Sequence, residues 1–300
     1  MVYYVDEEAD GSHGCRLPRS RLKSLPCPPR RTETGVTVLN LMIDSITLTY
    51  IGHATVLIEM NGVRVLTDPL LRDRAGFLRR CKAPIDPKSY QNIDAVLISH
   101  LHMDHMDPPS LRLLDHKARL IVPLGAADIL KKSGDQHIDE IGINDSIRIG
   151  LVTIRSTYAE HAHSRYPLGP IAECIGYVIR GSHTVYFAGD TDLFPGMTDI
   201  ANDLDVALLP VWGWGPTIRG LHMNPHRAAQ ALTLLQPRLA IPIHWGTMAP
   251  LGLVWMKPPF LTRPPHDFAR YAARLAPRVK VQILTPGSSL TMDGDSLNAS

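Results

Sequence analysis

A dense cluster of histidine and aspartate side chains lies where a predicted strand ends and a predicted helix begins. Residues 99–105 have the sequence Ser-His-Leu-His-Met-Asp-His and follow the apolar run 95–99, which is typical of a buried strand. Asp107 and Pro108 then predict the N-cap and the first position of a helix over residues 110–116. The chain must therefore fold so that this strand end presents several groups that can bind metal.

Alternate side chains of an extended segment point the same way, and this divides the cluster into two pairs. His100 and His102 can reach one ion, whereas Asp104 and His105, at the turn toward the helix, can reach a second ion beside it. Imidazole and carboxylate ligands together suit Zn, Fe, Ni or Mn. The alternative interpretation is a chance group of polar residues on a solvated loop.

Short β-rich runs bounded by Gly, Pro, Asn or Asp recur on both sides of the cluster. The first set covers residues 46–50, 55–59, 63–67, 95–99, 120–122 and 147–154, and the second covers 176–180, 184–188, 206–210, 240–243 and 279–284. Helices are predicted over residues 110–116, 226–236 and 265–276. Two β-rich halves with interspersed helices predict two sheets packed face to face with helices outside, a layered α/β arrangement.

The composition excludes several classes of protein. The chain has 300 residues, 44% hydrophobic and 20% charged, with a formal net charge of +2, so it gives no electrostatic indication of a nucleic-acid or membrane-surface protein. The cysteines are too far apart for a zinc ribbon or a Cys-x-x-Cys redox motif: Cys15, Cys27, Cys81 and Cys174. Homo-oligomer formation is compatible with this composition.

The first 41 residues differ from the rest of the chain. Acidic residues precede a Pro- and Arg-rich stretch, residues 16–31, with almost no apolar periodicity. We therefore expect residues 1–41 to be a disordered extension and residues 42–300 to form a single domain. The acidic start does not resemble a signal peptide, and no run is long enough for a transmembrane segment, so we expect a cytoplasmic protein.

Two ions need more ligands than the first cluster holds, and three further strand ends offer them. His161 follows the strand predicted to end near residue 154, Asp190 lies in Gly-Asp-Thr after residues 184–188, and His244 lies in Ile-His-Trp-Gly-Thr after residues 240–243. Each also has an ordinary alternative as a capping aspartate or a hydrogen-bonded core histidine.

Taken together, these motifs resemble those of the metallo-β-lactamase-fold hydrolases. The resemblance runs from the Tyr-Ile-Gly-His-Ala-Thr-Val-Leu-Ile-Glu segment at residue 50 to residue 287 and includes Leu-Thr-Asp-Pro at 66–69. Within that superfamily, the chain is most similar to the branch with N-acyl-phosphatidylethanolamine phospholipase D and the ascorbate-6-phosphate lactonase. The resemblance implies a four-layer αβ/βα sandwich of two mixed sheets with helices on the outer faces.

The resemblance also implies a ligand set for two divalent ions, with zinc expected and manganese or iron as alternatives. One ion would be held by His100, His102 and His161, the other by Asp104, His105 and His244, and Asp190 would bridge them. His163 competes with His161, and we prefer His161 because the family's Arg follows its ligand at a spacing similar to that of Arg165.

A hydroxide bridging two such ions would be the nucleophile. Asp104 would orient the water, and His222 matches a family histidine on the substrate side, so both are expected to be catalytic. Asp68, and less strongly His53, are expected to orient ligating imidazoles, although turn capping explains Asp68 nearly as well. Further residues expected beside a substrate, each with an ordinary core or surface alternative, are Arg165, Trp212, Trp214, Arg219 and Trp245.

The leading hypothesis is a dinuclear metal-dependent hydrolase that cleaves a phosphodiester or a lactone in a small-molecule or lipid-like substrate. A nucleic-acid-processing nuclease is disfavoured, because such members carry an inserted domain and basic surfaces that this chain lacks. A di-iron redox protein is disfavoured because those members have Glu where this chain has His102. A sensor or binding protein that retained the fold is disfavoured because all seven ligand positions are filled.

Overall fold

The computed structural model describes residues 44–82, 84–131, 137–161, 170–200, 202–216, 218, 222–256, 258–294 and 296–299. The predicted extension over residues 1–41 lies outside the described residues, as do His163, Arg165 and Arg219. The domain boundaries at residues 41 and 42 therefore remain a prediction. None of the helices in the described part of the chain is long and apolar enough to cross a bilayer.

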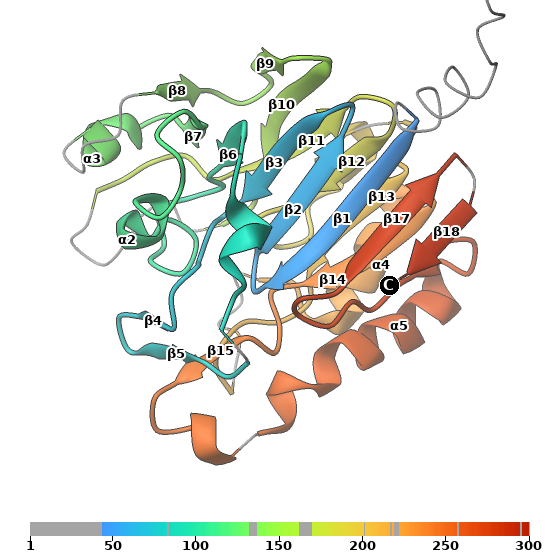
Figure 1. Cartoon of the computed structure of the whole chain (residues 1–300). Coiled ribbons are helices and arrows are strands. Elements are labelled where there is room, and N and C mark those ends of the chain that lie inside the picture. Colours follow the sequence, from blue (N-terminus) through green and yellow to red (C-terminus); the bar gives the residue numbers. More distant parts are fainter. Residues whose placement is uncertain are drawn as a thin grey trace, which may run out of the picture.

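Two large mixed sheets and one small sheet make up the β-structure (Figure 1). The first sheet contains, in spatial order, β18 (Ser296–Ala299), β17 (Ser289–Asp293), β1 (Ser45–Gly52), β2 (Thr55–Met60), β3 (Val63–Thr67), β6 (Ala95–Leu97), β7 (Arg119–Pro123) and β8 (Ile138–Ile141). The second contains β16 (Lys280–Val281), β14 (Leu239–Ile243), β13 (Val206–Pro210), β12 (Thr184–Phe187), β11 (Ile175–Arg180), β10 (Val152–Tyr158) and β9 (Ser146–Ile149). The small sheet contains β15 (Met248–Pro250), β5 (Leu78–Arg80) and β4 (Arg74–Ala75).

Successive side chains along a strand point to opposite faces of the sheet, and in the first sheet both faces are apolar. Val65 of β3 and Ile121 of β7 pack in the central core with residues of the second sheet such as Tyr177. Their neighbours in sequence, Leu66 and Val122, pack in a separate outer cluster. Each such buried aliphatic side chain contributes about 1.5–3 kcal/mol by leaving water. The period-2 pattern thus produces a sheet that needs a second layer on each side.

Helices supply the outer layers. α2 (Pro108–Leu111) and α3 (Ala127–Lys131) place Leu111 and Leu130 in the outer cluster of the first sheet. On the second sheet lie α4 (Pro225–Leu235) and α5 (Arg263–Leu275), which contribute Leu232 and Phe268 to the core. Short 3₁₀ turns complete the description: η1 (Pro87–Tyr90), η2 (Pro195–Asp199), η3 (Val254–Met256) and η4 (Pro259–Leu261). The predicted four-layer α/β sandwich is confirmed.

Several predicted boundaries are wrong. Residues 147–154 form a hairpin, β9 and β10, because the chain turns at Gly150 in a left-handed conformation, φ 56°. The helix expected over residues 110–116 ends at Leu111, after which the amides of Leu113 and Leu114 donate to the carbonyls three residues earlier, those of Ser110 and Leu111, in tight turns. The strand expected over 279–284 is the two-residue edge strand β16. The elements not predicted are β4, β5, β8, β15, β17, β18 and α3.

Candidate metal centre

The predicted site residues meet at one edge of the two large sheets because each follows a strand that ends there. Asp68 follows β3, His100 follows β6, His161 follows β10, Asp190 follows β12 and His244 follows β14. All five are buried. Parallel pairs, β3 with β6 and β12 through β14, bring carboxyl ends to the same edge, which is where α/β sheets bind ligands.

The first group of ligand atoms consists of three imidazole nitrogens. His100 Nε2 lies 2.9 Å from His102 Nδ1, which in turn lies 3.1 Å from His161 Nε2. Burial lowers the pKa of His102, and burial together with neighbouring histidines holds the pKa of His100 well below its usual value. The neutral form of His100 and His102 is therefore favoured, which is the form that binds a metal ion.

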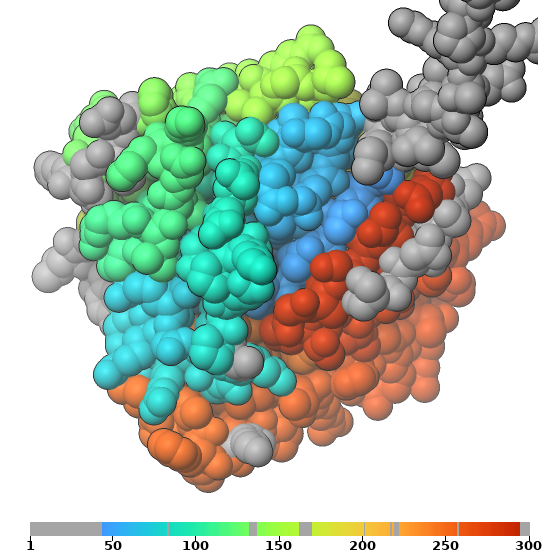
Figure 2. All heavy atoms as spheres, in the orientation of Figure 1, coloured from blue at the N-terminus to red at the C-terminus, as the bar shows by residue number. Residues whose placement is uncertain are grey.

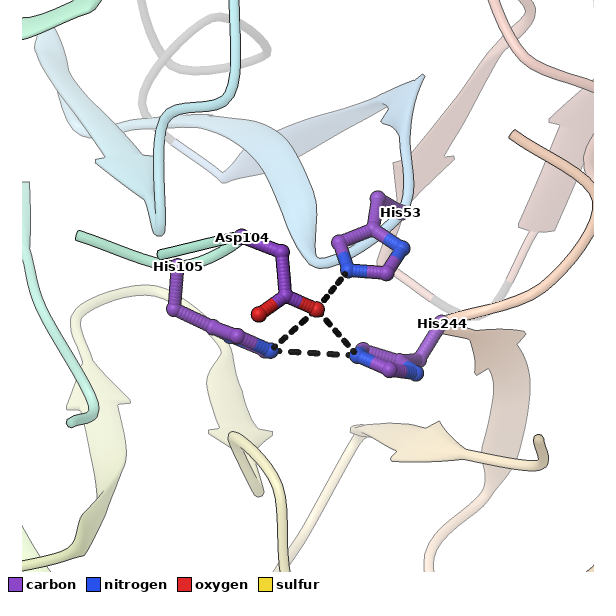
Figure 3. A group of neighbouring side chains, drawn as sticks. All are labelled: His53, Asp104, His105 and His244. Atoms are coloured by element: carbon purple, nitrogen blue, oxygen red, sulfur yellow. Dashed lines mark hydrogen bonds and ion pairs between the residues drawn. The ribbon is translucent and has the colours of Figure 1, made fainter. Parts of the chain in front are cut away.

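The second group lies beside the first and contains an aspartate among three histidines (Figure 3). His105 Nε2 faces His244 Nε2 at 3.0 Å, and each lies 3.8 Å from Asp104 Oδ2. His53, from the turn between β1 and β2, places its Nε2 2.9 Å from the same oxygen. Imidazole and carboxylate atoms converge here within 4.8 Å of one another, so this group could hold a second ion.

The carboxylate of Asp190 reaches both groups. Its Oδ2 lies 3.2 Å from His105 Nε2 and its Oδ1 lies 3.2 Å from His244 Nε2, while the Nε2 atoms of His100 and His161 lie 4.0 Å from Oδ2. Burial opposes its ionisation, but the surrounding histidines hold its pKa well below the usual value. Its buried Oδ1 has no hydrogen-bond partner among the described residues. A buried, ionised oxygen of this kind fits a cation lying between it and the imidazoles.

Hydrogen bonds to Nδ1 orient the imidazole rings of His105 and His244 toward this centre. Asp68 Oδ2 accepts from His105 Nδ1 at 2.7 Å and from Ser99 Oγ at 2.6 Å. The carbonyl of Trp212 accepts from His244 Nδ1 at 2.9 Å. Each contact leaves Nε2 of the ring directed into the cluster, which is how outer groups orient metal ligands. The backbone acceptor on Trp212 has no sequence signature and was not predicted.

The backbone is strained at three of these positions. His53, Asp68 and His244 have φ values of 59°, 33° and 61°, in the left-handed region that non-glycine residues rarely adopt. The amide of His244 donates to the carbonyl of His53 at 2.7 Å, and the amide of His53 donates to Thr247 Oγ1 at 2.9 Å. These contacts maintain conformations that cost about 1–3 kcal/mol each, a pattern found at functional sites.

His222 lies at the exposed margin of the cluster. Its Nδ1 is 3.1 Å from Asp190 Oδ2, and the side chain remains 21% exposed. Burial opposes protonation, but Asp190 raises the pKa of the ring above its usual value. Asp190 therefore favours the protonated form of an imidazole that remains partly open to solvent.

The three tryptophans predicted near the site take different positions. Trp245 is a core residue, which was the alternative interpretation: it is 5% exposed, stacks on Tyr50 and donates to the carbonyl of Pro242. Trp212 is half-buried beside the site, and its Nε1 donates to the carbonyl of Gly215. Trp214 packs edge-on against Phe77 at 5.0 Å.

Gly189 is required for the turn into Asp190. It has φ +61°, and a Cβ built there would lie 2.6 Å from Ser99 Cβ. We expect Gly189→Ala to lower the free energy of unfolding by roughly 2–4 kcal/mol, measured by urea denaturation. Gly62→Ala is the matched control, because Gly62 has φ +74° and open space around it. That control should lose only about 1 kcal/mol, and an equal loss in both variants would contradict the close approach to Ser99.

Comparisons with known proteins identify the family of this chain. A family model described as a beta-lactamase superfamily domain matches residues 63–245, a span that includes all seven predicted ligands. A UPF0173 metal-dependent hydrolase from Methanopyrus kandleri is 32% identical over 250 residues, 81% of this chain and 98% of that protein. The chain belongs to the UPF0173 family. The family's description as metal-dependent hydrolases fits the His/Asp cluster, which could bind metal.

Two further proteins are similar to this chain. An uncharacterized protein from Mycobacterium tuberculosis is 31% identical over 228 residues, and the chain spans only 61% of its length. The structure of Igni18, a metallo hydrolase from the archaeon Ignicoccus hospitalis, superposes with a TM-score of 0.62 at 25% identity and covers 83% of this chain and 98% of its own. Membership of the phospholipase D and ascorbate lactonase branch remains a prediction.

Proposed function

We propose that the protein is a dinuclear metal-dependent hydrolase. In this proposal His100, His102 and His161 hold one divalent ion, and Asp104, His105 and His244 hold the other. The observation that carries the proposal is the position of Asp190. Its carboxylate lies 3.2 Å from the Nε2 atoms of His105 and His244 and 4.0 Å from those of His100 and His161. A carboxylate shared in this way is suited to bridge two ions.

The roles of this chain's own groups follow from their positions. When bound, two divalent ions supply a hydroxide nucleophile at neutral pH and offset the charge that develops on the substrate. Asp104, fixed by its contact with His53, orients the attacking water. His222 donates a proton to the leaving group, since its side chain is 21% exposed at the margin of the cluster and Asp190 favours its protonated form.

We propose a small or lipid-like substrate with a phosphodiester or lactone bond. Support comes from a cavity of about 380 Å³ lined by Trp212 and Asn224, and by the rings of His226, Phe260 and Tyr271. Trp212 links this cavity to the cluster, because its side chain lines the cavity and its backbone carbonyl accepts a hydrogen bond from His244. Aromatic walls of this kind accommodate apolar ligand groups.

The proposal is tested with protein stripped by a chelator and reloaded separately with zinc, manganese or iron. We expect hydrolysis within a panel of phosphodiesters and lactones, loss of activity after stripping, and recovery on reloading. His102→Ala, tested in parallel, should show neither activity nor recovery. Turnover that survives complete removal of metal would contradict the proposal, and ligand binding without turnover under every metal would favour the sensor hypothesis.

His53 provides a narrower prediction. His53→Ala removes the group 2.9 Å from Asp104 Oδ2, so the second ion should bind about 10–100-fold more weakly, as measured by competition with a chelator. His53→Gln, which retains a donor, should recover part of the affinity. His183→Ala is the matched control, because His183 is also buried but lies in the β11–β12 turn, at the opposite end of those strands. Unchanged affinity in His53→Ala would remove His53 from the metal centre.

A further inference from the structure

The small sheet and the turn after it carry exposed apolar side chains. We call this region, residues 74–82 and 248–256, the β5–β15 lobe. Trp255 and Met256 in η3 are 80% and 72% exposed, Phe77 at the β4–β5 turn is 41% exposed, and Leu251 after β15 is 36% exposed. Scattered exposed apolar residues are ordinary on a protein surface, but a contiguous group marks an interaction surface.

These side chains belong to one continuous surface. β5 pairs with β15 so that Leu78 lies opposite Pro250, and the amide of Leu251 donates to the carbonyl of Phe77 at 3.1 Å. The guanidinium of Arg79 lies 5.9 Å from the ring centre of Trp255. The cyan hairpin and the orange segment lie together at the lower left corner of the molecule (Figures 1 and 2).

Cations surround this apolar surface. Arg74, Arg79 and Lys82 are exposed, and none forms a salt bridge within the described part of the chain. Residues 74–82 and 248–266 contain no Asp or Glu, and the one carboxylate directly beside the hairpin in sequence is the exposed Asp73 that precedes Arg74. The net charge of +2 for the whole chain is an average over the surface and does not reveal this local excess.

The lobe also adjoins the metal centre. A Cβ built on Gly76 would lie 2.7 Å from the sulfur of Met103, which stands between His102 and Asp104. Phe77 contacts Trp214, two residues from the Trp212 carbonyl that accepts from His244. A partner bound to the lobe would therefore lie close to the segments that carry the metal-binding side chains.

We propose that the β5–β15 lobe docks on the surface of an anionic lipid bilayer. Tryptophan and methionine at an exposed tip insert among lipid headgroups and acyl chains, and flanking arginine and lysine attract anionic lipids. A protruding tip with aliphatic and thioether side chains fits an interface better than it fits nucleic acid, which needs a groove with stacking platforms. Docking is a property of this surface and does not depend on hydrolysis.

The test is sedimentation of the full-length protein with two kinds of vesicle, phosphatidylcholine alone and phosphatidylcholine mixed with phosphatidylglycerol. Three cations near the surface should make binding to the anionic vesicles on the order of 100-fold tighter. Trp255→Ala combined with Met256→Ala should weaken that binding by a similar factor, because two large apolar side chains no longer insert. Arg74→Gln combined with Arg79→Gln should remove most of the preference for anionic lipid.

Matched controls separate this docking from other effects. Leu151→Ala combined with Ile171→Ala, which removes two exposed apolar residues elsewhere, should leave vesicle binding unchanged. His102→Ala should also bind vesicles normally, so that failure of the hydrolase proposal is distinguishable from failure of this one. Binding that is equal for both vesicle types, or unaffected by the lobe variants, overturns the proposal. A concentration-dependent dimer that is lost in the Trp255 variant, with no vesicle binding, assigns the surface to a second copy instead.

Discussion

Asp190→Asn should lower the metal content from two ions per chain to one or fewer and abolish most turnover. An amide carries no charge, so it bridges two cations poorly. The substitution also removes the carboxylate that lies 3.2 Å from the Nε2 atoms of His105 and His244. Removing one member of a buried charge pair costs about 3–5 kcal/mol, which corresponds to roughly 10²–10⁴-fold weaker binding of the second ion.

Elemental mass spectrometry after dialysis against a weak chelator measures this change. Asp192→Asn is the matched control, because Asp192 is two residues away and pairs with Arg227 rather than with the cluster. That control should retain both ions and full turnover. If Asp190→Asn kept its metal content and its turnover, Asp190 would have no place in the site.

His222→Ala should retain both ions while turnover falls by about 10²–10⁴-fold, the effect expected of a lost proton donor. His222 contacts Asp190 through Nδ1, but the three-nitrogen group and the Asp104 group are complete without it. If it contacts only the ground-state substrate, KM should rise while kcat holds.

His266→Ala is the control for this variant, since His266 is exposed on α5. Steady-state kinetics and metal analysis on the same preparations give both readouts. Loss of metal from His222→Ala would show that His222 is itself a ligand. His222 does lie in a group with His161 and Asp190 that could hold a metal ion. In that case the assignment of His161 as a ligand would have to be revised.

Much of the cluster could be predicted because its signals are local. His100, His102 and His105 lie in one short segment, and the others directly follow runs with a clear strand pattern. Asp68 was identified in the same way, as a polar residue at a strand end, and the structure places it against His105. The recurrence of short β-rich runs in two halves, with helices between the strands, likewise predicted the two stacked sheets.

Other features depend on contacts between distant segments. The small sheet pairs residues near 79 with residues near 249 through strands of two or three residues, which are too short to show a period. The environment of Trp245 depends on its contact with Tyr50, nearly two hundred residues earlier. The lobe's charge was hidden because composition averages over the surface, whereas the fold gathers Arg74 and Arg79 at one corner.

Anomalous X-ray scattering from crystals of the metal-loaded protein tests the central claim most directly. The account predicts two peaks about 3.5–4 Å apart, one beside the nitrogens of His100, His102 and His161 and one beside Asp104, His105 and His244, with the Asp190 carboxylate between them. A single peak at saturating metal, or peaks away from these side chains, would contradict the dinuclear site.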